Sequence, residues 1–189
     1  MKKTGRTMTL SGQLPRRNFQ QQLFRNPHPI LEYANVLDIN RAWRVKYYKT
    51  WVQETPLEMG FQDGCYWTVD TQLSTDEIPG NTMWNNAGEN RAIAWETLSY
   101  DSNRATLKGQ DLGQPSGEIP RNLMNVETWV HPDHIVQNKL TISAHAFGTN
   151  YAENATYVLN YIVELEEVEI SPTESIVFNI KSKAQDLET

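Results

Sequence analysis

Short runs in which apolar and polar residues alternate with a period of two recur through most of the chain, and this pattern constrains the fold most strongly. The clearest run covers residues 139–147, where every second side chain from Leu140 to Ala146 is apolar. Such alternation is typical of β-strands that place one face in a core. Runs with strand character cover residues 42–54, 65–73, 91–100, 123–130, 139–147 and 155–170. Because no helical segments alternate with these runs, we predict an all-β fold, either a β-sandwich or a single jelly roll.

The run at residues 42–54 predicts which aromatic side chains enter the core. Trp43, Val45, Tyr47 and Trp51 fall on one face of an uninterrupted strand. Tryptophan buries a large apolar area. We therefore expect this face to point inward and its tryptophans to anchor the core.

The last segment of the chain changes its period. Ser171, Pro172 and Glu174 form a capping-box sequence with proline at the first helical position, and apolar residues follow at helical spacing. This pattern predicts a short helix over residues 172–187. A strand over residues 176–181 is the alternative, because isoleucine and valine are mediocre helix formers.

The charge of the chain is unevenly distributed, although the net charge is only -6. Residues 1–31 contain no acidic side chain, whereas the chain as a whole has 23. The six cations of this segment are Lys2, Lys3, Arg6, Arg16, Arg17 and Arg25. We predict three parts: a basic N-terminal arm (1–31), a β-sandwich (32–171) and a C-terminal helical tail (172–189).

A cationic arm on an acidic body has two interpretations. The cations could make sequence-independent contacts with nucleic-acid phosphates. They could equally dock on the acidic face of another subunit, for which the run from Glu164 to Glu169 is a candidate. We therefore predict that these six residues form a nucleic-acid or inter-subunit binding arm.

Residues that would support catalysis or metal binding are sparse. His131, His134 and His145 are the most metal-like set, but a proline separates the first two and no His-x-His sequence occurs. Nucleophile motifs and phosphate-binding loops are absent from the sequence, and the single cysteine, Cys65, excludes a disulfide framework. We expect no catalytic residue, no metal, no cofactor and, because no apolar run is long enough to span a bilayer, no membrane association.

The end of the chain resembles a known family. Residues 139–148 (KLTISAHAFG) and 156–188 (TYVLNYIVELEEVEISPTESIVFNIKSKAQDLE) resemble the last strands and tail of capsid proteins from small circular single-stranded DNA viruses. The resemblance implies a structural protein of the virion, in which many copies self-assemble into an icosahedral shell around a small single-stranded nucleic-acid genome. Arms of that family are richer in arginine, so six cations leave open whether the arm meets the genome or ties subunits together.

A carbohydrate-binding module is the alternative function. Two loops rich in Asn, Asp, Gly and Pro, at residues 74–90 and 101–120, could bind a sugar by hydrogen bonds and by stacking on Trp84. The same loops would suit the outer surface of a capsid. Composition therefore leaves a lectin-like β-sandwich as the second expectation.

Overall fold

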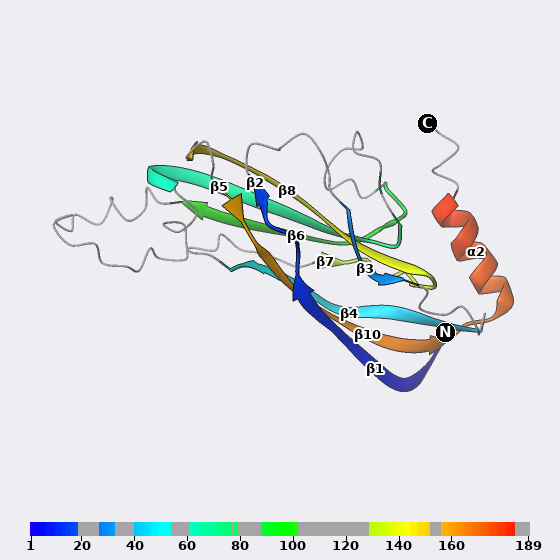
Figure 1. Ribbon diagram of the computed structural model, residues 1–189. Helices are drawn as coiled ribbons and strands as arrows, with labels where there is room; N and C mark the ends of the chain where they lie inside the picture. Colours follow the sequence, from blue (N-terminus) through cyan, green and yellow to red (C-terminus); the bar gives the residue numbers. More distant parts are fainter. Residues whose placement is uncertain are drawn as a thin grey trace.

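The structure, a computed structural model, describes residues 1–18, 27–32, 40–53, 61–76, 78, 88–101, 129–151 and 156–183 (Figure 1). Predicted features outside these ranges include Arg25, Trp84 and most of the two long loops. The elements in order are β1 (Lys2–Gln13), β2 (Arg17–Asn18), β3 (His28–Glu32), β4 (Arg41–Val52), β5 (Phe61–Ser74), β6 (Ala92–Asp101), β7 (Trp129–Val130), β8 (Lys139–Tyr151), β9 (Thr156–Tyr157), β10 (Leu159–Glu169) and α2 (Pro172–Lys183).

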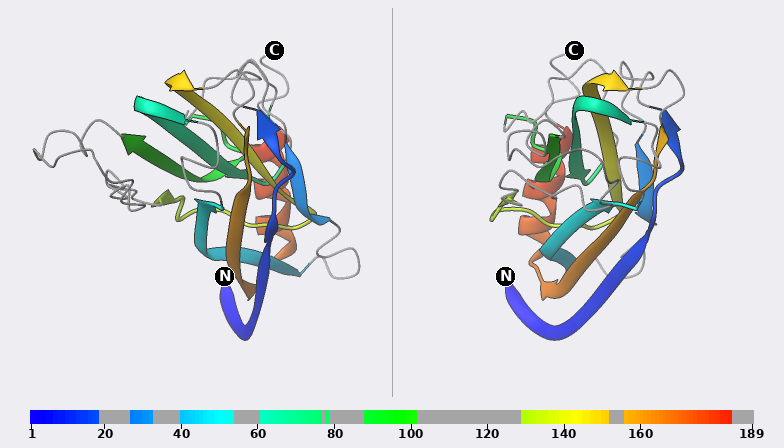
Figure 2. Two further views of the ribbon diagram at one scale, coloured as in Figure 1. Left: turned by 60° about the vertical axis from the view of Figure 1, so that its left-hand side comes forward. Right: turned by 90° about the vertical axis from the view of Figure 1, so that its left-hand side faces the viewer.

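The strands form two antiparallel sheets that lie across one another, with α2 at one side of the molecule (Figures 1 and 2). One sheet has the order β1-β10-β4 and the other β3-β8-β5-β6-β7, while β2 and β9 form a short ribbon. Buried side chains from both large sheets belong to one hydrophobic cluster. The prediction of an all-β sandwich with a short C-terminal helix is confirmed.

Strand β8 shows how the period-two pattern builds this core. Leu140, Ile142, Ala144 and Ala146 are all buried in the cluster between the sheets, as their alternation predicts. From the opposite sheet, β10 contributes Val163 and other buried residues to the same cluster. The sandwich is therefore held together mainly by apolar burial between two sheets.

Strand β4 follows the predicted pattern only at its start. Val45 is buried as expected, but Tyr47 and Trp51 are 42% and 43% exposed. Tyr48 and Val52 occupy the core in their place. The prediction that the whole apolar face of residues 42–54 points inward is wrong beyond Val45.

A β-bulge explains the change of face in β4. Val45 pairs with Leu165 and Tyr47 pairs with Glu164, so Lys46 is an extra residue with no opposite partner in the register. One extra residue moves every later side chain to the other face of the sheet. The bulge therefore turns two predicted core aromatics toward solvent.

Helix α2 begins with the predicted capping box. The Ser171 backbone N–H donates to Glu174 Oε2 over 2.8 Å, and the Glu174 N–H donates to Ser171 Oγ over 3.2 Å. The helix extends to Lys183, and the predicted residues 184–187 lie outside the described part. The alternative of a strand over residues 176–181 is wrong.

The N-terminal segment forms a strand of the sandwich, where the sequence predicts an arm. Residues of β1 pair antiparallel with β10, and Met8 and Leu10 pack against the core cluster. Thr7, Thr9 and Ser11 alternate with them and are exposed. This alternation is short and lies between the cations Arg6 and Arg16, so the sequence predicts a basic arm where the structure has a strand.

Candidate assembly interface

The predicted opposite charges meet along the seam between β1 and β10, within one chain. Lys3 Nζ lies 3.0 Å from Glu166 Oε2, and Arg6 Nη1 lies 3.9 Å from Glu167 Oε1. The Thr4 hydroxyl donates a 2.7 Å hydrogen bond to Glu167 Oε2. The N-terminal cations thus neutralise acidic residues of the strand beside them.

Glu167 is the centre of this seam because partners reach it from both neighbouring strands. On the β4 side, Arg41 Nη1 lies 3.4 Å from Glu167 Oε1. The hydrogen bond from Thr4, followed by the charges of Arg41 and Arg6, holds the pKa of Glu167 below its ordinary value. One buried carboxylate therefore ties β1, β10 and β4 together.

A local irregularity in β1 brings these groups to Glu167. Between Lys3 and Thr7 the register of β1 against β10 shifts, and Gly5 has a φ of 83°. Glycine adopts this left-handed conformation without the steric cost that a Cβ imposes. The resulting bulge places Thr4 and Arg6 beside the same carboxylate.

The other predicted arm cations are spread over different surroundings. Lys2 is exposed and pairs in register with Glu169, whereas Arg16 Nη1 donates to Thr156 Oγ1 over 3.0 Å. Arg17 Nη1 donates to the Ala144 carbonyl over 3.1 Å, and burial lowers the pKa of this guanidinium. Arg25 lies outside the described residues. The structure therefore brings Lys3 and Arg6 together but places Arg16 and Arg17 elsewhere, beside β8 and β9.

The seam has a surface of mixed sign. Lys3 and Arg6 keep 67% and 69% of their side chains exposed, although each is paired with a buried carboxylate. Two further acids of β10, Glu164 and Glu169, are exposed on the same strand. A phosphate backbone favours an excess of positive charge, which this arrangement lacks. The geometry suits contact with a protein surface better than contact with a polyanion.

The candidate metal-binding histidines have other partners. His134 Nε2 accepts a 2.9 Å hydrogen bond from the Val45 backbone N–H, and His134 Nδ1 bonds to the His131 carbonyl. Both ring nitrogens of His134 are thus used, as in a neutral imidazole that is protonated on Nδ1. His145 lies on β8 opposite Asp70 of β5. Within the described ranges, no three His, Cys, Asp or Glu side chains gather as metal ligands.

His134 makes stability depend on pH. Burial, opposed by the bond to His131, lowers its pKa from 6.5 to about 4. At this site the unfolded chain therefore binds a proton more tightly than the folded chain. The contribution of neutral His134 to the free energy of unfolding is fully present above about pH 6.5 and is lost as the pH falls toward 4. We expect a loss of about 3 kcal/mol in the free energy of unfolding over this window. Urea unfolding at pH 7 and pH 4.5 measures it, and a His134→Asn variant should lose most of this slope. An NMR titration that finds the His134 ring titrating near 6.5 would contradict the expectation.

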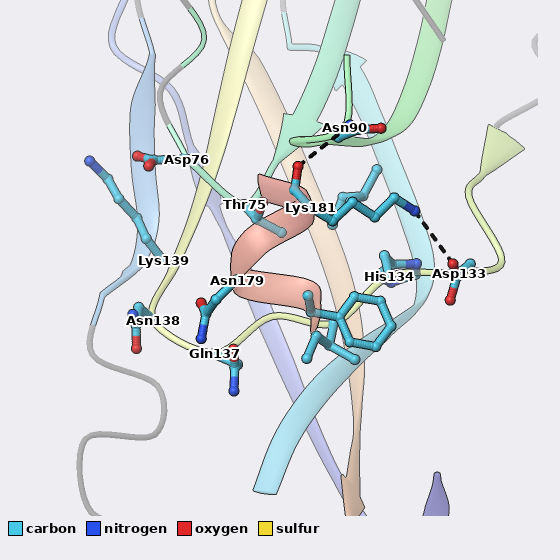
Figure 3. A pocket seen from close by; sticks show the side chains of 13 residues that line it. Thr75, Asp76, Asn90, Asp133, His134, Gln137, Asn138, Lys139, Asn179 and Lys181 are labelled. Carbon is cyan, nitrogen blue, oxygen red and sulfur yellow. Dashed lines mark hydrogen bonds and ion pairs between the residues drawn. The ribbon is translucent and has the colours of Figure 1, made fainter. Parts of the chain in front are cut away.

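The sequence gives no signal for a pocket of about 290 Å³ that lies beside α2 (Figure 3). Lys181 Nζ lies 3.4 Å from Asp133 Oδ2, and the Asn90 side-chain amide donates to the Lys181 carbonyl over 3.4 Å. Amide and charged side chains of both signs form most of its wall, and Phe178 and isoleucines form the apolar part. These residues come from segments far apart in the chain, so no local pattern could predict the pocket.

The fold defines an all-β sandwich protein with a C-terminal helix. A scan against models of protein families finds no match for this sequence, and no curated protein matches it. In the described part of the chain, no helix is long and apolar enough to cross a membrane.

Proposed function

We propose that this chain is a structural capsid protein that self-assembles into an icosahedral virion shell around a small nucleic-acid genome. The strand order carries the proposal. Apart from the short strand β2, the strands β1, β3, β4 and β5 alternate between the two large sheets, and β5 to β8 then all lie in the five-stranded sheet. The first strand, β1, pairs with the last, β10. This order supports a jelly roll, an architecture that recurs in viral capsid and lectin domains.

The surface of the protomer supports association with other copies. Large apolar side chains are exposed on separate parts of the molecule, on β4, on β7 and on α2. They are Tyr47, Trp51, Trp129, Ile176, Val177 and Ile180. Ile176, Val177 and Ile180 lie within little more than one turn of α2, and aromatic residues such as those exposed on β4 and β7 are enriched at protein interfaces. Several separate contacts are what a closed shell requires of each subunit.

The charged seam supports a particular role for the N-terminal segment. Lys3 and Arg6 are already paired with acids of their own chain, and Arg17 is half-buried. The pairing of Lys3 and Arg6 and the partial burial of Arg17 therefore weaken the attraction of these three cations for the phosphates of a genome. We propose that the described part of the segment acts mainly in the fold and in subunit contacts.

Co-purification with nucleic acid tests the proposal. Protein expressed in cells should sediment through a sucrose gradient far faster than a 21.8 kDa protomer and should protect bound nucleic acid from added nuclease. Protein treated with nuclease after the particles are disrupted in high salt is the control, because exposed nucleic acid should then be degraded. A stable monomer that binds glycans and no nucleic acid would instead favour the lectin-like alternative, for which the half-exposed Trp129 against Trp95 offers a stacking surface.

A further inference from the structure

The edges of the two large sheets differ in how well they are protected from pairing with another chain. In the described part of the molecule, the five-stranded sheet ends in β3, which has five residues and contains Pro29, and in β7, of which Trp129 and Val130 are described. Short strands and prolines are common protections of sheet edges, and so are cations. The three-stranded sheet ends in β4 and β1. Strand β4 carries the cations Arg41, Arg44, Lys46 and Lys49.

Residues 7–13 of β1 lack these protections. Their sequence, TMTLSGQ, contains no charged residue and no proline, and their register against β10 is unbroken. The cations of β1 and its bulge lie before this stretch, at residues 2–6. Among the described edge strands, this stretch of β1 is therefore the one best suited to pair with a strand of another chain.

One hydrogen bond fixes which backbone groups of this stretch face outward. The Leu14 N–H donates to the carbonyl of Leu159, the first residue of β10, over 2.8 Å. The backbone groups of Leu14 therefore point toward β10. Backbone groups alternate in direction along an antiparallel strand. Counting back from Leu14, the N–H and C=O groups of Met8, Leu10 and Gly12 point toward β10. Those of the four alternate residues, Thr7, Thr9, Ser11 and Gln13, point toward the free edge.

The side chains at the free edge are suited to pairing of like with like. The four residues with outward backbone groups also have exposed side chains, and three of these carry small hydroxyl groups. Cross-strand Thr–Thr and Thr–Ser pairs stabilise antiparallel sheets. The apolar Met8 and Leu10 side chains are directed into the core.

We propose that residues 7–13 of β1 pair antiparallel with the same residues of a second copy of this chain, about a two-fold axis at Leu10. This contact rests on the proposed assembly and names one interface within it. In this register Thr9 pairs with Ser11 of the second copy and Thr7 pairs with Gln13, so every outward N–H and C=O group of the four residues finds a partner. Arg6 faces Leu14 of the second copy, so within residues 6–14 no cation opposes another cation. Two three-stranded sheets thereby become one continuous sheet.

Disulfide trapping between two variants tests this register. Thr9→Cys and Ser11→Cys are prepared separately, each with Cys65→Ser, and one carries a mass tag. Directly opposed residues of this kind have Cα atoms about 5.5 Å apart, within disulfide range, whereas the diagonal distance in either homodimer is about 7–8 Å. Mild oxidation of the mixture should give the disulfide-linked dimer of one tagged and one untagged chain as the main product. Its yield should be several-fold higher than the yield of the homodimer that each variant forms when it is oxidised alone. Thr173→Cys, exposed on α2, replaces Thr9→Cys in the control mixture.

The outcomes separate this contact from the proposed shell. Preferential trapping of the mixed dimer supports the β1 interface, whatever the size of the final assembly. Large particles that trap no more mixed dimer than the control overturn the β1 interface and leave the shell proposal standing. Protein that stays monomeric and untrapped at every concentration overturns both. Both exposed positions leave the core untouched, and circular dichroism of each variant checks that its fold is kept.

Discussion

A chain that lacks residues 1–13 is expected to fail to fold as a stable protomer. The deletion uncovers β10 along its whole length, removes Met8 and Leu10 from the core cluster and leaves Glu166 without Lys3. Glu167 loses Thr4 and Arg6 and keeps only Arg41 of its described ion-pair partners. Two half-buried apolar side chains and a buried carboxylate together contribute an amount comparable to the roughly 5–15 kcal/mol that stabilises a typical domain.

Complementation distinguishes a missing strand from a general loss of solubility. A synthetic peptide of residues 1–16 added to the truncated chain during refolding should restore the circular dichroism spectrum of the full-length protein, because an added strand can complete a sheet. A peptide of the same composition in scrambled order is the control. If the truncated chain unfolds in urea at the same midpoint as the full-length chain, β1 is not part of the stable sandwich.

The second large effect is expected from Arg91→Ala. Arg91 and Glu89 form a forked ion pair at the start of β6, with Nε 2.8 Å from Oε1 and Nη2 3.0 Å from Oε2. Both side chains are almost fully buried, at 7% and 4% exposure. The substitution takes the forked arginine partner away from a buried carboxylate, so we expect a loss of about 3–5 kcal/mol in the free energy of unfolding.

A double variant controls for packing at this site. Glu89→Leu combined with Arg91→Met removes both charges and keeps apolar volume, so it should be clearly more stable than Arg91→Ala. Urea denaturation at pH 7 compares the three proteins. A loss below about 1 kcal/mol for the single variant would mean that the pair is solvated and contributes as little as a surface salt bridge.

The parts of the fold that the sequence predicts correctly depend on local patterns. The alternation in β8 and the capping box at Ser171 each involve residues close together in the chain, and both are found as expected. The bulge at Lys46 is different, because it arises from pairing with a strand more than a hundred residues away. No pattern within residues 42–54 shows the extra residue, so the exposure of Tyr47 and Trp51 could not be read from the sequence.

The candidate interface was predictable only in part. The opposite charges of the N-terminal segment and β10 are visible in the sequence, and Lys3 and Glu166 do form a pair. The sequence cannot show whether such a pair forms within one chain or between two chains. The charges of two segments show that they attract each other, but not whether the partner segment belongs to the same molecule. The buried Glu89–Arg91 pair was equally hidden, since nothing local distinguishes it from two solvated charges.

The mass of the assembled protein tests the proposed shell most directly. Native mass spectrometry of the freshly purified full chain, in volatile buffer near physiological ionic strength, should give particles far heavier than 21.8 kDa. Once the mass of the enclosed nucleic acid is subtracted, the remainder should be one large whole-number multiple of the protomer mass. A single population at the protomer mass, unchanged as the protein concentration is raised, would contradict the shell.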